Sequence, residues 1–320
     1  MDFAFISCPV TLSQLRLSRP GLRLIPGGLL SGLNRFLPIK EKAMLDVAGA
    51  PGVILEYPGL PEYLVDLSPS AIEKKAVQIG KILAANNIKI LGLEDSLQPL
   101  APVICAEHPV RIPTGLTITL AALLAVFSNF LSENTNSRAV IISPLSPPGA
   151  VIARLLAPRL RSLVLVSNLR PGLKRLAQKI IQETGTASVL SHWHPGLLPE
   201  TDIIIDLAGL DLSELKSPAL IWQPYGGRPP QSARTLGLPL LDFPGVPAVH
   251  GDLPAGILRP NLTEAILVAT GERRLWARNF NELTAANVIT ASKQSRVCKL
   301  RVTASCLDGY IHWFPAPIEI

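Results

Sequence analysis

Residues 139–157 read AVIISPLSPPGAVIARLLA, and this stretch decides the fold. Its first four residues are all apolar, as expected of a strand that is buried on both faces of a parallel sheet. A loop rich in serine and proline follows, and apolar side chains then recur at helical spacing from Gly149 onward. The stretch therefore predicts a strand, a tight loop and a helix that begins directly from that loop.

The same alternation continues downstream. Residues 171–183 predict an amphipathic helix with leucine and isoleucine on its inner face. Apolar strands that alternate with helices form a parallel sheet covered on both faces. Their order and spacing favour a doubly wound, Rossmann-like nucleotide-binding domain over residues 138–245. Four further apolar runs predict strands, at residues 163–166, 187–190, 202–206 and 219–222.

The preceding part of the chain also predicts α/β structure. Short apolar runs predict strands, and Ser68-Pro69 predicts the start of a helix, because serine caps helices and proline suits the first turn. We predict an N-terminal α/β substrate-side domain over residues 1–132, ending in a long helix over residues 116–131. The Rossmann-like domain follows, and residues 246–320 form C-terminal helices that pack back on the N-terminal domain, plus a tail.

Composition limits the classes of function. Hydrophobic residues make up 48% of the 320-residue chain and charged residues 17%, which argues against long disordered regions. The net charge is +6, but no basic run is interleaved with aromatic residues, so we expect no nucleic-acid partner; a basic cleft for an anionic cofactor fits equally well. Polar residues interrupt the apolar run at residues 116–131, which favours a buried helix over a membrane span. No signal peptide or Cys-x-x-Cys motif is seen, so we expect a cytoplasmic protein of undetermined oligomeric state.

The loop after the first quoted strand is where a dinucleotide-binding loop would lie. Such loops use three glycines for a tight turn, for backbone approach to the pyrophosphate and for helix–strand packing. Here Ser143 and Ser146 occupy the first two glycine positions, and Gly149 occupies the third. Three prolines in the same loop carry no N–H group, which removes three possible phosphate donors.

Ser146 is expected to cap the helix, with Pro147 at its first position. The N–H groups of Gly149 and Ala150 would then remain free at the positive end of the helix, where anions bind. Two interpretations stay open. The loop is either a cofactor site of unusual shape or part of an inherited fold that no longer binds a dinucleotide.

Asn168 and Arg170 follow the second predicted strand of this domain. Asn168 lies about where a dinucleotide-binding domain places the side chain that reads the ribose. An acidic residue there would favour NAD, whereas Asn168 with Arg170 and Lys174 would tolerate the 2′-phosphate of NADP. The alternative is an ordinary basic start of a helix.

Two other groups of polar residues are weaker candidates. Histidines at alternate positions could ligate a metal, but no matching ligands lie at close sequence spacing, so we predict a loop pair and no metal site. Asp202 and Asp206 bracket a predicted strand, and we favour a loop-capping role for Asp206 over ligand binding. The possible metal ligands considered above are His192, His194, Cys105, Glu107 and His108.

Several of these pieces together resemble the long-chain acyl-carrier-protein reductases that form fatty aldehydes. They are more distantly similar to the nucleotide domains of shikimate dehydrogenase and glutamyl-tRNA reductase. The resemblance covers about residues 50–275 and implies an NAD(P)-dependent oxidoreductase fold. The matching pieces are residues 89–93, 112–119, 139–156, 163–166, 253–256 and 262–265.

The chain departs from that family at its functional positions. The family carries a glycine-rich loop where this chain has the two serines, and a basic residue where it has Asn168. The family's cysteine nucleophile matches Asn261, whose amide cannot form an acyl thioester. Fatty-aldehyde formation by that route is therefore not expected.

Two functions are consistent with the sequence. The first is an NAD(P)-dependent oxidoreductase acting on a carbonyl or acyl substrate, although no general acid or nucleophile is evident. The second is a non-catalytic binding or scaffolding protein that keeps the reductase fold. In the first case the cofactor could be NADP or NAD and in the second none. The substrate side would be lined by Thr114, Gly115, Thr119, Asn261 and Glu264.

Overall fold

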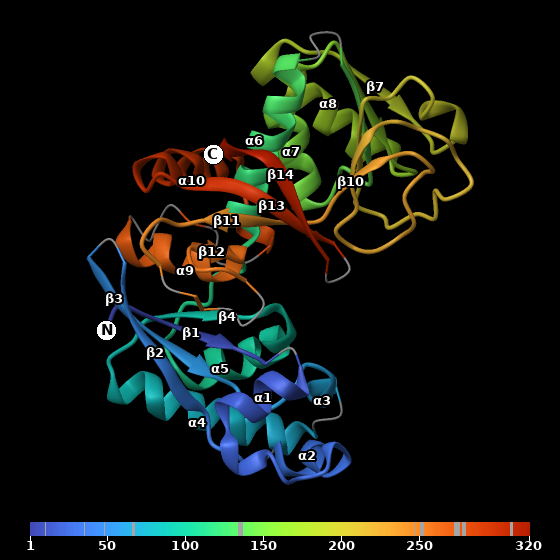
Figure 1. Ribbon diagram of the computed structural model, residues 1–320. Coiled ribbons are helices and arrows are strands. Elements are labelled where there is room, and N and C mark those ends of the chain that lie inside the picture. The colour runs from blue at the N-terminus through green and yellow to red at the C-terminus, as the bar shows by residue number, and fades with distance from the viewer. Residues whose placement is uncertain are drawn as a thin grey trace. The chain divides into compact units, whose positions relative to one another are not determined.

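The chain divides into two units, which are described separately (Figure 1). Unit 1 contains Met1–Leu116 and Leu241–Arg278, and unit 2 contains Thr117–Leu240 and Asn279–Ile320. The computed structural model describes residues 1–9, 11–34, 36–47, 49–65, 68–133, 137–246, 248–249, 253–271, 276, 280–307 and 310–320.

Unit 1 is built on a four-stranded sheet with the order β2-β3-β1-β4. Strand β1 (Phe3–Ser7) pairs in parallel with both β3 (Ala50–Glu56) and β4 (Ile90–Leu93), while β2 (Lys40–Val47) pairs antiparallel with β3. The strongly apolar β1, β3 and β4 are almost entirely buried, whereas β2 lies at the edge and alternates between exposed and buried residues. This is the expected difference between central and edge strands.

Helices cover both faces of the unit 1 sheet. On one face, α4 (Pro69–Ala85) and α5 (Ala101–Glu107) cover a core formed by alternate residues of the strands. On the other face, α9 (Pro260–Thr270) packs on β4, β1 and β3. Gly92 allows this close packing, because a Cβ atom there would lie 2.6 Å from the Phe5 ring and 3.1 Å from Ala265 Cβ.

Shorter elements complete unit 1. Helices α1 (Leu12–Ser18) and α2 (Gly27–Asn34) share a small leucine-rich cluster with the 3-10 turn η1 (Pro20–Leu22). The remaining elements are α3 (Glu62–Val65), η2 (Asp95–Leu100) and β12 (Ile257–Leu258), which pairs antiparallel with Leu241 and Asp242 at the end of β11 (Leu238–Asp242).

Unit 2 contains a six-stranded sheet whose five strand pairings are all parallel. Its order is β10-β9-β8-β5-β6-β7. Numbered from β5, this is 3-2-1-4-5-6 read from the β7 edge, the order of dinucleotide-binding Rossmann domains. The predicted fold class is therefore confirmed. The strands are β5 (Arg138–Ile142), β6 (Ser162–Val166), β7 (Ser188–Ser191), β8 (Ile203–Asp206), β9 (Leu220–Trp222) and β10 (Arg234–Leu236).

The two halves of this sheet are connected differently. Helices α7 (Pro147–Leu156) and α8 (Arg170–Thr184) join β5, β6 and β7. Between β8 and β10, however, the chain forms loops, and the opposite face of the sheet is covered by segments around Trp193 and residues 210–215 (Figure 1). The sheet is therefore covered on both faces, as expected. Helices connect the strands only in the half formed by β5, β6 and β7.

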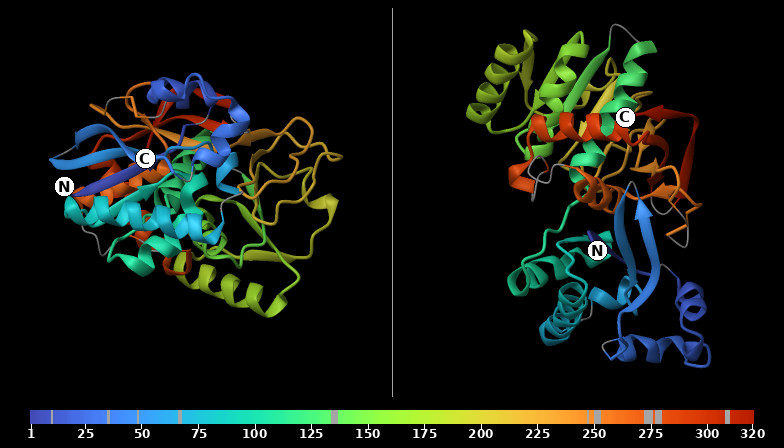
Figure 2. Two further views of the ribbon diagram at one scale, coloured as in Figure 1. Left: turned by 90° about the horizontal axis from the view of Figure 1, so that it is seen from below. Right: turned by 90° about the vertical axis from the view of Figure 1, so that its left-hand side faces the viewer.

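The remaining elements of unit 2 lie beside α7. The long helix α6 (Leu116–Glu133) precedes β5, and α10 (Ala285–Val297) packs against α7 (Figure 2). Among the described helices α6 is the one whose length and hydropathy would allow a membrane span, and 56% of it is buried in the structure, as in a core helix. The tail forms an antiparallel hairpin of β13 (Arg301–Leu307) and β14 (Tyr310–Glu319). Short 3-10 turns lie at η3 (Ala157–Arg159), η4 (Pro195–Leu197) and η6 (Phe280–Glu282).

Candidate functional site

The loop between β5 and α7 makes the turn expected of a dinucleotide loop, but without glycine at its start. Ser143 has φ +60°, a left-handed conformation that costs a non-glycine residue on the order of 1 kcal/mol. Its N–H donates to the carbonyl oxygen of Val166 at 2.9 Å, so β6 holds the turn in place. The backbone path therefore persists although serine has replaced glycine.

Gly149 has the packing role of a third glycine. A Cβ atom there would lie 2.7 Å from the Leu207 side chain and 2.8 Å from Pro144 Cα. Helix α7 thus lies too close to its own loop and to the chain after β8 for any side chain to fit. Such a contact fixes the helix on the sheet, but it also places the Pro144 backbone beside the start of the helix.

The N-terminus of α7 lacks the free donors that an anion would need. Pro147 and Pro148 have no N–H group. As predicted, Ser146 caps the helix, and its Oγ accepts the N–H of Gly149 at 3.4 Å. The N–H of Ala150 donates to the carbonyl oxygen of Ser146 at 2.9 Å. The prediction that the N–H groups of Gly149 and Ala150 remain free is wrong, because cap and helix use both.

Leu145 occupies the next part of the loop. A Cβ atom on Gly172, in the first turn of α8, would lie 2.7 Å from Leu145 Cδ1. The leucine side chain therefore packs between the loop and the start of α8. A ribose that ran from a phosphate loop toward the end of β6 would pass through this region. In their present positions the loop residues do not fit the pyrophosphate and ribose of a dinucleotide.

Asn168 and Arg170 lie beyond β6 and are exposed. The Asn168 Oδ1 atom lies 3.4 Å from the Nδ1 atom of His192, which follows β7. Arg170, Lys174 and His192 also line a recess of about 260 Å³ between the start of α8 and the end of β7. The recess could receive an anionic group, and within it Arg170, which the sequence predicted for the cofactor site, lies near Lys174.

Asp206, at the end of β8, is fully buried. Its carboxylate accepts the N–H groups of Ala208, Gly209 and Leu210 at 2.7–3.1 Å and the Nε2 amide of Gln223 at 2.8 Å. All these donors belong to the protein, so the carboxylate organises the loop after β8. This confirms the loop-capping interpretation that the sequence favoured.

The substrate-side residues predicted from the sequence fall mainly in unit 1. Asn261, near the start of α9, donates through Nδ2 to Asp95 Oδ1 at 2.6 Å and to the carbonyl oxygen of Leu93 at 3.0 Å. Gly115 has φ +74°, and a Cβ atom there would lie 1.9 Å from Asn261 Oδ1. Thr114 Oγ1 accepts the N–H of Leu116. These three residues therefore form one tight structural junction at the end of β4.

The other two substrate-side residues lie elsewhere. Glu264 is fully buried one turn further along α9, and Thr119 is a buried residue of α6 in unit 2. The predicted histidine group is likewise divided, with His192 and His194 in unit 2 and His108 in unit 1. No group of three or more potential metal ligands is found among the described residues.

The carboxyl ends of the unit 1 strands carry charged residues that sequence reasoning did not single out. Glu94, after β4, accepts the N–H of Cys8 at 2.5 Å and lies 3.5 Å from the Arg259 guanidinium. Glu56, at the end of β3, lies 3.4 Å from Arg19 Nε. Both carboxylates are more than 90% buried, and each retains an arginine close by. The only sequence signal was that each glutamate directly ends an apolar run.

Cys8 lies in this region but is not activated. Burial raises the pKa of its thiol, and the Glu94 carboxylate raises it further. The Sγ atom donates to the carbonyl oxygen of Gly59. Because the thiolate is the nucleophilic form, a thiol held protonated in this way is not a nucleophile.

Lys75 is a second unusual group in unit 1. It is 2% exposed, donates to the carbonyl oxygen of Leu37 and lies 5.7 Å from the centre of the Tyr57 ring. Burial lowers the pKa of its ammonium group to about 8, and the nearby Arg19 guanidinium contributes to the shift. Desolvation and a neighbouring like charge both disfavour the protonated form.

Comparisons with known proteins find only distant structural similarities. No family model matches the chain, and no curated protein matches it. Among solved structures, it is similar to quinate dehydrogenase from Corynebacterium glutamicum in complex with NAD, at 10% identity over 69% of this chain and 79% of that one, with a TM-score of 0.31. It is also similar to L-tryptophan dehydrogenase from Nostoc punctiforme, at 15% identity over 70% of this chain and 62% of that one, with a TM-score of 0.30. At such overlap the chain's own strand order, rather than these similarities, identifies the Rossmann-like fold of unit 2.

Proposed function

We propose that this chain is a non-catalytic binding protein that keeps the Rossmann architecture of oxidoreductases. One observation carries the proposal. At the N-terminus of α7, the first two helical residues have no N–H group, and the next two N–H groups are bonded within the protein. Dinucleotide binding depends on free donors at this place, because they contact the pyrophosphate.

Two further features support the proposal. The Leu145 side chain packs toward α8 where the ribose would lie. Cys8, on unit 1, is held protonated and bonded to a carbonyl, and Asn261 is fixed by two hydrogen bonds. The chain therefore offers neither a thiolate at Cys8 nor a free side chain at Asn261 for acyl or carbonyl chemistry.

The first test is calorimetry of the purified protein with NADH and NADPH. We expect no saturable binding of either nucleotide up to about 1 mM. A matched variant, Pro147→Ala with Pro148→Ala, restores two N–H groups at the helix start without adding charge. It is expected to bind NADH more tightly than the wild type. Micromolar binding by the wild-type protein would overturn the proposal.

An NAD(P)-dependent oxidoreductase acting on a carbonyl or acyl substrate is the second candidate. It is favoured by the strand order of unit 2 and by the recess beside His192, which is lined by the cations Arg170 and Lys174. If this function holds, the wild type binds NADPH more tightly than NADH, because the cations would receive the 2′-phosphate. Arg170→Gln with Lys174→Gln would then remove the preference and leave NADH binding unchanged.

A further inference from the structure

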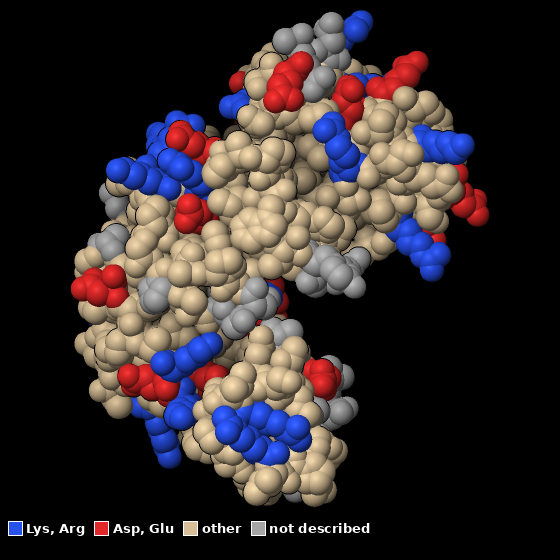
Figure 3. All heavy atoms as spheres, viewed as in Figure 1, with Lys and Arg blue, Asp and Glu red and all other residues tan. Residues whose placement is uncertain are grey.

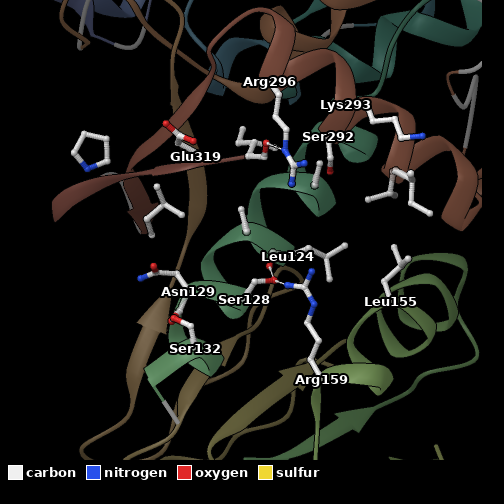
Figure 4. A pocket seen from close by; sticks show the side chains of 17 residues that line it. Leu124, Ser128, Asn129, Ser132, Leu155, Arg159, Ser292, Lys293, Arg296 and Glu319 are labelled. Atoms are coloured by element: carbon white, nitrogen blue, oxygen red, sulfur yellow. Dashed lines mark hydrogen bonds between the residues drawn. The ribbon is translucent and has the colours of Figure 1, made fainter. Parts of the chain in front are cut away.

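A large recess in unit 2 lies away from the nucleotide loop. It has a volume of about 580 Å³ and is formed by α6, the end of α7 with η3, α10 and the end of β14 (Figure 4). Helix α7 begins at the carboxyl edge of the sheet and η3 follows its last residue, so the recess lies at the opposite end of that helix from Gly149. Its volume is that of a site for a small organic ligand.

Two arginines reach into the recess from opposite walls. Figure 4 shows Arg159, from η3, and Arg296, from α10, pointing toward one another across it. Arg159 donates to Ser128 Oγ, and Arg296 Nε donates to the main-chain oxygen of Ile320, the last residue of the sequence, at 3.2 Å. A guanidinium carries five N–H donors, so each arginine keeps donors for a ligand. Lys293 adds a third cation at the rim.

The positive charge here is not balanced by side chains. Among the described residues, no aspartate or glutamate side chain lies within ion-pairing distance of Arg159, Lys293 or Arg296. Glu319 is the only acidic side chain among the residues that line the recess. An adjoining recess of about 400 Å³ shares Arg296 and adds Lys299 and Arg301. Figure 3 shows lysine and arginine side chains gathered over α10, with acidic side chains beside them.

Much of the lining between the arginines is apolar, although Ser128 and Ser292 lie beside them. Leu124, Leu155, Val288 and Ile289 form this apolar wall, and Ile289 is 45% exposed. Fixed cations that flank an exposed apolar wall suit a ligand with an anionic head and an apolar body, since guanidinium binds carboxylate and phosphate oxygens in pairs. A simple inorganic anion would leave the apolar wall in water.

We propose that this recess binds an anionic amphiphile, with its carboxylate or phosphate head between Arg159 and Arg296 and its apolar body against Leu124, Leu155 and Val288. The site is independent of the nucleotide loop. It rests on the binding function proposed above and names the ligand chemistry. Binding or absence of binding of NADH and NADPH, however, does not bear on this recess.

Calorimetry of the full chain with octanoate and with octyl phosphate tests the proposal, and the tighter of the two identifies the head group. We expect that ligand to bind at least tenfold more tightly than octanol, which lacks the charge, and than inorganic phosphate or acetate, which lack the chain. Arg159→Gln with Arg296→Gln is expected to weaken binding at least tenfold.

The matched control is Arg175→Gln, which removes one positive charge from an exposed position on α8 outside the recess. It is expected to leave binding unchanged, and circular dichroism verifies that every variant is folded. The proposal is overturned if neither amphiphile shows saturable binding below about 1 mM. Binding that the double substitution leaves intact, or equal binding of octyl phosphate and inorganic phosphate, would also overturn it.

Discussion

The mixed sheet of unit 1 and the parallel sheet of unit 2 differ in the groups that lie at the carboxyl ends of their strands. In unit 1 the edge carries Glu56 and Glu94, each buried beside an arginine. In unit 2 the edge carries a proline-rich loop that bonds to itself, and the charge of Asp206 is satisfied by four protein donors. Ligands of open α/β sheets bind at this edge. The comparison shows that strand order creates the location, whereas free polar groups decide whether anything can bind there.

The largest effect is expected from Asp206→Ala, which breaks the self-contained edge of unit 2. The substitution removes the acceptor of three backbone N–H groups and one of the two acceptors of the Gln223 amide, in a partly buried loop. We expect the free energy of unfolding to fall by at least about 3 kcal/mol, measured by urea denaturation.

Asp211→Ala is the matched control for this variant. Asp211 lies on the same loop but is exposed and accepts hydrogen bonds from Ser213 alone. We expect the free energy of unfolding of Asp211→Ala to differ little from that of the wild type. Equal losses in the two variants would show that Asp206 does not organise the loop.

The next effect concerns the unit 1 edge at Gly115. Gly115→Ala places a methyl group against Asn261 and strains a left-handed residue, so we expect a loss of about 2–3 kcal/mol in the same measurement. Gly245→Ala is the control, because Gly245 has φ +84° with no atom within 4 Å of a Cβ position. It isolates the conformational strain, expected at about 1 kcal/mol. If the free energy of unfolding falls equally in both variants, the contact of the new methyl group with Asn261 does not destabilise the protein.

The smallest effect is a pH dependence in unit 1 from Lys75. Its pKa is lowered from 10.5 to about 8 in the folded protein, so above pH 8 the folded state has released a proton that the unfolded chain still binds. Stability from this group therefore rises as pH increases from about 8 toward 10.5, by less than about 1.4 kcal/mol per pH unit.

Urea denaturation of the wild type and of Lys75→Met at pH 7.5, 8.5 and 9.5 (about one unit apart) tests this dependence. The difference in unfolding free energy is expected to shift in favour of the wild type as pH rises. A difference that is constant, or that shifts the other way, would show that the amine keeps an ordinary pKa.

Much of unit 2 could be predicted from the sequence. The central residues of β5, β6, β8 and β9 are apolar, and such runs have few structural alternatives when helices or loops separate them. Ser68 and Ser146 correctly marked helix starts, because capping depends on local sequence. The tail over residues 298–320 had only a weak alternation, and it forms a strand hairpin.

The candidate sites were less predictable because they depend on partners distant in the sequence. The pairing of Glu94 with Arg259 and the contact of Asn261 with Asp95 each join segments more than 160 residues apart. The cavity between Arg159 and Arg296 likewise needs α6, α10 and β14 together. The sequence predicted that Ser146 caps the helix, but it did not show that the cap and the first helical bond would use the N–H groups of Gly149 and Ala150.

The unequal connections in unit 2 also bear on how the chain folds. The β5-α7-β6-α8-β7 half contains helices whose contacts are local in sequence, so little loop entropy is lost before they form. The β8–β10 half must close loops that have no helix of their own and depend on Asp206 to organise one of them. The half with loops is joined to the helical half through the pairing of β8 with β5, so its three strands depend on contacts that are more distant in the sequence.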